Sequence, residues 1–144
     1  MAMLTIGSNQ NKQIEAFTHT LTQTLSLAQE EALMQPTTLS LRLSPTQFGF
    51  YEYRQKEKNQ EQGWHPLENR DLGLQTIPKG IQLSLQMNDK LHSISYEEAA
   101  PFIYISPNGN LTPFRLLIGP KNKGPRYEII GQVDGSLISR EYKS

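Results

Sequence analysis

The sequence contains no cysteine and no surplus of charge of either sign. Because none of its 144 residues is cysteine, the chain has no disulfide framework, no thiolate metal site and no cysteine nucleophile. Lysine plus arginine and aspartate plus glutamate both total 14, so the chain as a whole creates no large field that would favour nucleic acid, an anionic membrane or an acidic substrate. These absences indicate that shape, more than net charge, selects its partners.

Long apolar runs are absent as well. No stretch approaches the ~20 apolar residues that span a bilayer, and the start has neither the basic region nor the apolar core of a signal peptide. A chain of 144 residues is long enough to bury one hydrophobic core but not comfortably two. We therefore expect a single domain over residues 1–144.

The first third of the chain has the spacing of an amphipathic helix. Ser8 or Asn9 is a suitable N-cap, and Pro36 ends the helix because proline disfavours helical backbone at the residue before it. The pattern predicts a helix over about residues 9–35, roughly 35–40 Å long at ~1.5 Å per residue, whose N-terminal end projects from the domain. Its apolar stripe recurs every three or four positions: Ile14, Phe17, Leu21, Leu25, Ala28 and Ala32.

After Pro36 the apolar spacing changes to every second residue. Leu39–Leu43 and Ile81–Met87 alternate apolar and polar side chains, which is typical of strands with one buried face. The expected fold is therefore α+β, with the helix packed on an antiparallel array, over about residues 37–142, that forms two sheets. Further strands, each bounded by turn residues, are predicted at 48–53, 91–96, 102–106, 114–118, 126–130 and 137–142, with short connections at 44–47, 88–90, 107–110 and 134–135 and longer loops at 55–63 and 119–125.

Several sequence blocks follow the helix in an order that resembles the GspH/FimT-type pseudopilin domain. The helix itself contains Ala28-Gln29-Glu30-Glu31-Ala32, and the likeness extends over nearly the whole chain. The best match is the H-type minor pseudopilin of a bacterial type II secretion system, which implies a pilin-like fold. The blocks are Phe48-Gly49-Phe50, Trp64-His65-Pro66-Leu67 with Asp71 and Leu74 after it, Ile77-Pro78-Lys79-Gly80, Ile105-Ser106-Pro107-Asn108-Gly109 and Thr112-Pro113-Phe114.

Members of this family begin with features that the sequence does not contain. These are a prepilin leader, a cleavage-site glycine, an aromatic N-terminal residue and a glutamate within an apolar membrane helix. None of these functional residues is therefore carried over, and we expect the natural protein to begin further upstream. The resemblance implies a single-pass protein of the bacterial inner membrane, with this domain in the periplasm.

The resemblance also implies a structural role without enzymatic activity. Such subunits assemble into a short periplasmic pseudopilus that drives folded proteins through the outer-membrane channel, and H-type subunits join the tip complex of I, J and K subunits to the shaft of major G-type subunits. Those subunits are the expected partners, and the isolated domain is expected to be mostly monomeric. The alternatives are a DNA-binding or adhesive FimT-type minor pilin of a type IV pilus and a carbohydrate- or peptide-binding β-domain.

Residues with ligand or catalytic chemistry do not form a recognisable motif. The histidines, His19, His65 and His92, lack metal-ligand spacing, and no serine lies in a GxSxG elbow. The acidic pairs at 30–31 and 97–98 are adjacent in sequence, whereas glycoside hydrolysis needs two carboxylates across a cleft. We therefore expect no catalytic residue, and no metal or cofactor.

Two Asp-containing turns could suggest calcium, because carboxylate and amide oxygens are its ligands. Neither Asn88-Asp89 nor Asp134-Gly135 belongs to the alternating acidic loop of an EF-hand. Both are interpreted as hairpin turns.

One basic cluster is the candidate nucleic-acid site. Lys121, Lys123 and Arg126 stand beside Tyr127, and cations next to an aromatic ring suit phosphate and base. FimT-type relatives take up DNA through a basic C-terminal motif, whereas the last residues here place an acid between two cations. A solvated loop is the simpler interpretation, and nucleic acid is not an expected partner. Trp64 is expected to plug the end of the sheet core rather than to serve as an exposed interface anchor.

Overall fold

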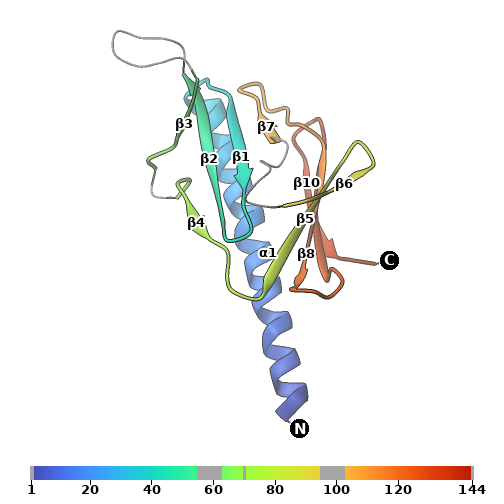
Figure 1. Cartoon of the computed structure of the whole chain (residues 1–144). Coiled ribbons are helices and arrows are strands. Elements are labelled where there is room, and N and C mark those ends of the chain that lie inside the picture. The colour runs from blue at the N-terminus through green and yellow to red at the C-terminus, as the bar shows by residue number, and fades with distance from the viewer. Residues whose placement is uncertain (1, 55–62, 70, 95–102, 144) are drawn as a thin grey trace.

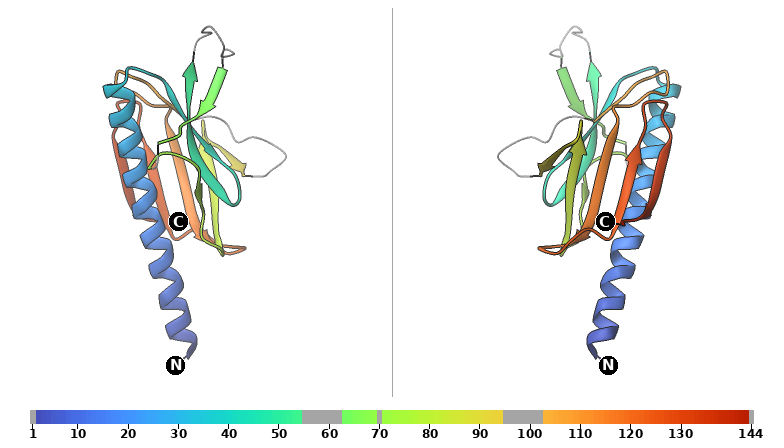
Figure 2. Two further views of the ribbon diagram at one scale, coloured as in Figure 1. Left: turned by 90° about the vertical axis from the view of Figure 1, so that its left-hand side faces the viewer. Right: turned by 90° about the vertical axis from the view of Figure 1, so that its right-hand side faces the viewer.

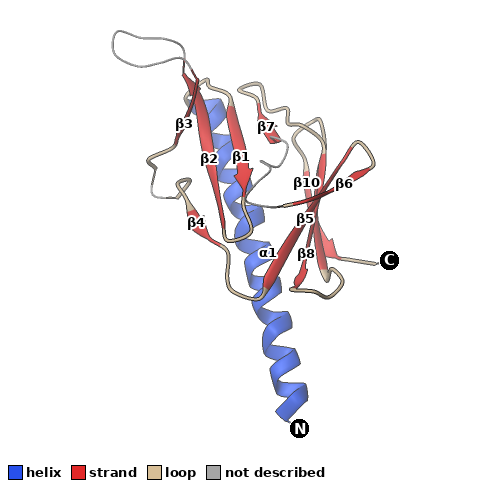
Figure 3. Ribbon diagram, viewed as in Figure 1, coloured by secondary structure: helices blue, strands red, loops and turns tan. Residues whose placement is uncertain are grey.

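The computed structural model describes residues 2–54, 63–69, 71–94 and 103–143 (Figure 1). A long helix, α1 (Ala2–Met34), precedes ten strands in the described residues (Figure 3). The strands form two antiparallel sheets, and α1 packs along them. The predicted α+β fold with one N-terminal helix and two antiparallel sheets is therefore confirmed.

Sheet 1 holds the strands that follow the helix and one that returns later. Its order is β3-β2-β1-β7, with β4 also paired to β2. All of these pairs are antiparallel. The strands are β1 (Leu39–Leu43), β2 (Gln47–Arg54), β3 (Gly63–Pro66), β4 (Gln75–Thr76) and β7 (Ile103–Ile105).

Sheet 2 has the order β10-β9-β8-β5-β6. Its pairs are antiparallel as well, and the β5–β8 pair brings together two segments that are far apart in the sequence. The strands are β5 (Ile81–Met87), β6 (Lys90–Ser93), β8 (Phe114–Pro120), β9 (Tyr127–Gly131) and β10 (Leu137–Glu141).

The predicted end of the helix is confirmed and its predicted start is wrong. The helix ends at Met34, just before Pro36, but it begins at Ala2 rather than near residue 9. Ser8 and Asn9 lie inside it, because a residue that is suited to capping does not oblige a helix to begin there when the residues before it can also be helical.

The core lies between α1 and the two sheets. All six residues of the predicted stripe are buried, and the Phe17 ring meets that of Phe48 edge-on at 5.9 Å between centroids. Two buried threonines satisfy their hydroxyls within the helix, since Thr18 Oγ1 donates to the Ile14 carbonyl and Thr24 Oγ1 to the Thr20 carbonyl. The helix and both sheets share one cluster of buried apolar residues.

Turn chemistry fixes the register of the hairpins. Asn88 and Asp89 both have positive φ, 52° and 63°, as a two-residue turn of type I′ requires. At the β9–β10 connection Gly135 has φ 95°, and Asp134 Oδ1 accepts a hydrogen bond from the Ser136 backbone at 2.9 Å. The interpretation of both segments as hairpin turns is confirmed.

The sequence did not reveal β3 and β4. They are short edge strands, and β3 ends in Pro66, which a strand tolerates only where no ladder hydrogen bond is needed. The predicted strands at 91–96 and 102–106 correspond to β6 (Lys90–Ser93) and β7 (Ile103–Ile105). Residues 95, 96 and 102 of these predictions lie outside the described residues. Residues 55–62, which make up most of the predicted polar loop, and the acidic pair at 97–98 lie outside the described residues.

Candidate functional site

The N-terminal part of α1 extends beyond both sheets (Figure 2). Lys12 and Gln13 still line pockets together with strand residues, so the segment that extends beyond the sheets is residues 2–11, roughly 15 Å at ~1.5 Å per residue. Within the described residues, no helix is both long enough and apolar enough to cross a bilayer. The helix therefore has a longer C-terminal part, from about Ile14, that packs on its own sheets and a shorter N-terminal part that extends beyond them.

Three loops gather at the end of the body from which α1 projects (Figure 1). They are residues 44–47, 77–81 and 119–126, and backbone hydrogen bonds join them: Ile77 donates to the Thr46 carbonyl at 2.7 Å and Lys121 to the Gly80 carbonyl at 2.8 Å. The loops line a pocket of about 480 Å³. We call it the lysine-rimmed pocket, and its lining includes Ile77, Ile81, Leu83, Ile94, Lys79 and Lys121.

The predicted basic cluster belongs to this end of the molecule. Lys121, Lys123 and Arg126 are all exposed on the β8–β9 loop. The structure adds Lys79, which sequence reasoning missed because only the pairing of β5 with β8 brings it near Lys121. Four cations are thus grouped where the sequence indicated three.

Tyr127, which was expected to accompany these cations, is directed elsewhere. Its hydroxyl donates to Glu15 Oε2 on α1 at 3.4 Å. Burial raises the pKa of Tyr127, and the charges of Glu15 and Glu141 raise it further. The Tyr127 ring is therefore engaged with the helix rather than with the basic loop.

Sheet 1 carries an aromatic surface on the side opposite the core. Trp64 packs edge-on against Tyr53 at 5.4 Å and lies 5.7 Å from Tyr104, between ring centroids. The Arg42 guanidinium lies 4.3 Å above the Tyr51 ring, a cation–π contact. Tyr53 and Tyr104 are 36 % and 42 % exposed, so this aromatic face has the composition of a protein interface.

The expectation that Trp64 plugs the sheet core is wrong. Trp64 is half-buried and lies outside the buried core. It pairs directly with Tyr53 across β3 and β2, and Tyr53 points away from the face that holds Phe48 and Phe50 because strand side chains alternate. The pairing of β3 with β2 decides on which face of sheet 1 the Trp64 side chain lies. The sequence did not reveal this pairing.

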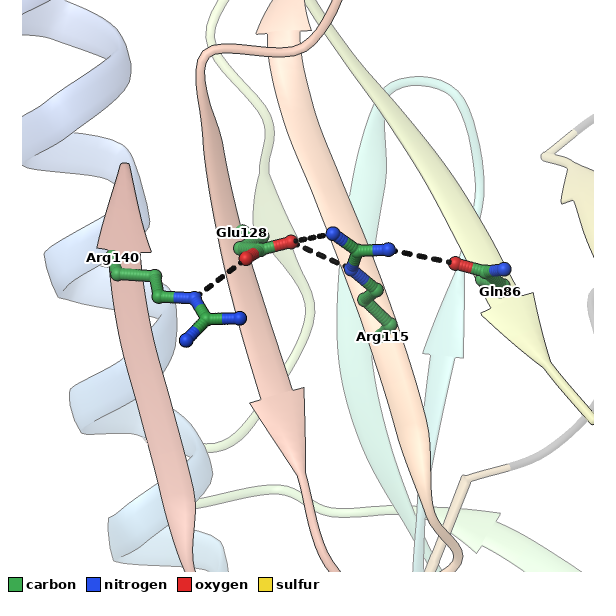
Figure 4. Close-up of polar contacts among 4 residues, drawn as sticks. All are labelled: Gln86, Arg115, Glu128 and Arg140. Atoms are coloured by element: carbon green, nitrogen blue, oxygen red, sulfur yellow. Dashed lines mark hydrogen bonds and ion pairs between the residues drawn. The ribbon is translucent and has the colours of Figure 1, made fainter. Parts of the chain in front are cut away.

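Sheet 2 carries a charged cluster on its own outer face (Figure 4). Glu128 is 2 % exposed and accepts hydrogen bonds from Arg115 Nε at 2.6 Å and Arg140 Nε at 2.7 Å. Arg115 also donates to Gln86 Oε1 at 3.3 Å. Burial acts to raise the pKa of Glu128, but the two arginines outweigh it and hold that pKa below its ordinary value. A carboxylate with a lowered pKa is a weak base, and the contacts of Glu128 join β9 to β8 and β10.

The histidines are not brought together. His19 lies on α1, His65 on β3 and His92 on β6. In the part of the chain that the structure describes, no three His, Asp or Glu side chains are grouped closely enough to hold a metal ion. The absence of a metal or cofactor stays a prediction.

A family model described as "Type II transport protein GspH" matches residues 18–135, which extend from α1 to the β9–β10 turn. The chain belongs to the GspH family. The family is that of minor pseudopilins of type II secretion, which identifies the domain as a GspH-type pseudopilin domain and confirms the resemblance seen in the sequence. No curated protein matches the chain.

Solved structures support the same fold. One structure of the minor pseudopilin EpsH from the type 2 secretion system of Vibrio cholerae matches with a TM-score of 0.74 and 21 % identity, over 88 % of this chain and 94 % of that one. A second crystal structure of EpsH from Vibrio cholerae matches with a TM-score of 0.74 and 20 % identity, over 90 % and 96 %. At this identity the likeness shows that the GspH-type domain shares the pilin-like arrangement of EpsH.

Proposed function

We propose that this GspH-family chain is the periplasmic domain of a minor pseudopilin that joins the tip complex of I, J and K subunits to the shaft of major subunits during protein export. The family match carries the proposal. It is a structural role without catalysis, in which residues 1–144 act as one domain. The partners are other pseudopilins.

The geometry of α1 supports this role. Its longer C-terminal part is held by the domain's own core, whereas its N-terminal part extends away from the sheets (Figure 2). A helix of this kind suits a subunit that is anchored in the inner membrane upstream of the domain and packs against neighbouring helices. The globular domains then contribute only modest contacts, of the size of transient interfaces below about 1,200 Å².

Sedimentation and secretion assays test the proposal. Alone in dilute solution, the chain is expected to sediment mostly as a monomer, because the stripe of α1 is already buried on its own sheets. Mixed with the I, J, K and major-subunit domains, it is expected to bind weakly. Deletion of its gene should abolish type II secretion, and the full-length gene should restore it. A tight homodimer through the helix stripe, or normal secretion without the gene, would contradict the proposal.

Nucleic-acid binding is the second candidate, because Lys121, Lys123 and Arg126 share one exposed loop. We expect weak, nonspecific binding, since so few cations neutralise few phosphates. Duplex binding can be measured at physiological salt with the wild-type chain and with all three residues changed to alanine. Sub-micromolar binding that the triple variant abolishes would favour a FimT-type minor pilin instead.

A further inference from the structure

The lysine-rimmed pocket combines apolar walls with two cations. Its walls include the buried residues Ile77, Ile81 and Leu83, and the exposed residues Lys79 and Lys121 also line it. In the part of the chain that the structure describes, neither lysine ammonium group takes part in an ion pair or a side-chain hydrogen bond. Apolar walls with a few placed polar groups are typical of binding pockets, and here they suit an apolar side chain with a carboxylate beside it.

A second hollow lies next to this pocket. Its volume is about 340 Å³, and Pro78 lines both cavities. Gln13 and Phe17 of α1 line the second hollow together with Phe48 of β2. The two hollows thus extend from α1 to the β8–β9 loop. A neighbour whose helix packs along the projecting part of α1 would carry its globular domain to this surface.

The carboxylates of this end of the body lie in a different place. Glu15 and Glu141 line a separate hollow between α1 and β10, where basic side chains accompany them. Among the described residues, no aspartate or glutamate lines the lysine-rimmed pocket. The acidic pair at 97–98 lies outside the described residues. Within the part of the chain that the structure describes, the pocket is therefore lined by positive charge alone.

The direction of α1 decides which neighbour the pocket meets. As proposed above, the chain is anchored in the inner membrane upstream of the domain, so the projecting part of α1 points toward that membrane. In a pseudopilus the tip complex lies far from the inner membrane, and the shaft lies on the membrane side of a subunit that joins the two. The pocket lies at the end of the body from which α1 projects (Figure 1). This end therefore faces the shaft.

We propose that the lysine-rimmed pocket is the docking site for the globular domain of a major shaft subunit, which inserts an apolar side chain flanked by a carboxylate. The apolar side chain packs on the walls of the pocket, and the carboxylate pairs with Lys79 and Lys121. The contact deepens the proposed function and rests on it, since a subunit at the junction meets the shaft through this end. The I, J and K subunits then bind elsewhere on the domain.

An anionic lipid surface would also suit two lysines beside an apolar pocket. Residues 2–11 of α1 extend beyond the sheets by roughly 15 Å, and a bilayer upstream of them lies at least that far from the pocket along the helix. The Debye length at physiological ionic strength is about 8 Å, so the attraction of exposed charges over this distance is largely screened. The distance therefore favours a protein neighbour over lipid.

The contact is expected to be weak between isolated domains. Exposed ion pairs each contribute little, and a pocket of about 480 Å³ encloses only a few side chains. In a filament, the packed helices raise the effective concentration of the two surfaces, so that a weak contact becomes populated. This agrees with the modest contacts between globular domains that we propose above.

Zero-length cross-linking tests the contact, because a carbodiimide joins a lysine amine to a carboxylate only where the two groups approach closely. The full chain is mixed with the periplasmic domain of the major subunit and, separately, with the I, J and K domains. By mass spectrometry we expect Lys79 or Lys121 joined to an aspartate or glutamate of the major-subunit domain. The yield should be roughly tenfold that of Lys90, an internal control that is exposed at the start of β6. No excess over Lys90, or cross-links to the I, J or K domains alone, would overturn the proposal.

Charge variants test the ion pairs by affinity. Lys79→Gln with Lys121→Gln should weaken binding to the major-subunit domain about fivefold, or about 1 kcal/mol. Lys79→Arg with Lys121→Arg keeps both charges and should leave the affinity within about twofold, although carbodiimide no longer couples these positions. Lys90→Gln is the surface control and should change nothing. Titration followed by NMR measures the affinities, and thermal melting confirms that each variant is folded. Equal affinities of the glutamine and arginine pairs would contradict the proposed ion pairs.

Lipid binding is measured with vesicles that contain anionic phospholipid. We expect the wild-type chain to bind them no better than the chain with Lys79→Gln and Lys121→Gln. Vesicle binding that this double variant abolishes, together with no cross-linking to the major-subunit domain, would overturn the proposal and assign the pocket to lipid.

The outcomes separate this contact from the proposed function. Absence of the cross-link, together with loss of secretion when the gene is deleted, would reject the contact and leave the pseudopilin role intact. A specific cross-link to the major-subunit domain, with unchanged secretion after deletion, would support the contact and reject the role in export.

Discussion

Replacement of Glu128 by glutamine tests how much the charged cluster of sheet 2 stabilises the fold. The substitution keeps the shape of a side chain that is 2 % exposed and removes the charge that Arg115 and Arg140 share. Hydrogen bonds to charged groups contribute about 1.5–3 kcal/mol each. The arginine side chains are 35 % and 58 % exposed, so solvent screening reduces that figure. We expect the free energy of unfolding at neutral pH to fall by about 1–3 kcal/mol.

The pH dependence follows from the lowered pKa of Glu128. A carboxylate whose pKa is lower in the folded than in the unfolded chain stabilises the fold above its unfolded pKa, about 4.3, and loses that contribution as the pH falls through its folded pKa. The difference in free energy of unfolding between the wild type and Glu128→Gln should therefore be full at pH 7. It should shrink as the pH falls below about 4.

Urea unfolding followed by tryptophan fluorescence at several pH values measures this difference. Glu52→Gln is the matched control, because Glu52 pairs with Arg54 on the same strand, β2, with side chains 20 % and 37 % exposed. The control should cost less than about 1 kcal/mol. Equal effects of the two substitutions at pH 7, or a Glu128→Gln effect that does not change with pH, would refute the reasoning.

Three further predictions concern the core and metal independence. Leu21→Ala should lower the free energy of unfolding, measured in urea, by about 2–5 kcal/mol. Leu27→Ala, on the exposed side of α1, should lower it by less than about 1 kcal/mol. Similar values for the two variants would contradict the packing of the helix. Gly131→Ala should lower the free energy of unfolding by about 1–3 kcal/mol, because the added Cβ would clash with the Phe114 ring. Gly124→Ala is the control, since its Cβ would meet no atom within 4 Å. Equal melting temperatures of the two variants would count against this strand packing. A chelator should leave the melting temperature unchanged, and a clear decrease would reveal a metal site needed for folding.

The helix and its buried side were predictable because they depend on local periodicity. Ile14, Leu21 and Ala28 are spaced so that they share one side of any helix that contains them, and all three are fully buried. The C-terminal end was predictable for an equally local reason, since Pro36 restricts the residue before it. The N-terminal end was not, because capping residues are also tolerated inside a helix.

The outer surfaces of the sheets depend on which strands become neighbours, and that information is not local. The charged cluster was not accessible from the sequence. A two-residue turn at Asp134-Gly135 would have paired Glu128 with Glu141, whereas the longer connection in the structure pairs Glu128 with Arg140. Arg115 joins them only because β8 lies beside β9. The aromatic face likewise requires β3, which is too short to be recognised and ends in proline.

The distribution of charge over the surface likewise depends on which strands become neighbours. The balanced totals of acidic and basic residues give a formal net charge of zero, but a sum says nothing about how charges are distributed. Lys79 and Lys121 meet only because Ile81 pairs with Pro120, so a basic cluster forms that neither loop contains on its own. The same totals of charge could have been spread evenly over the surface, and only the strand pairing decides that these cations lie together.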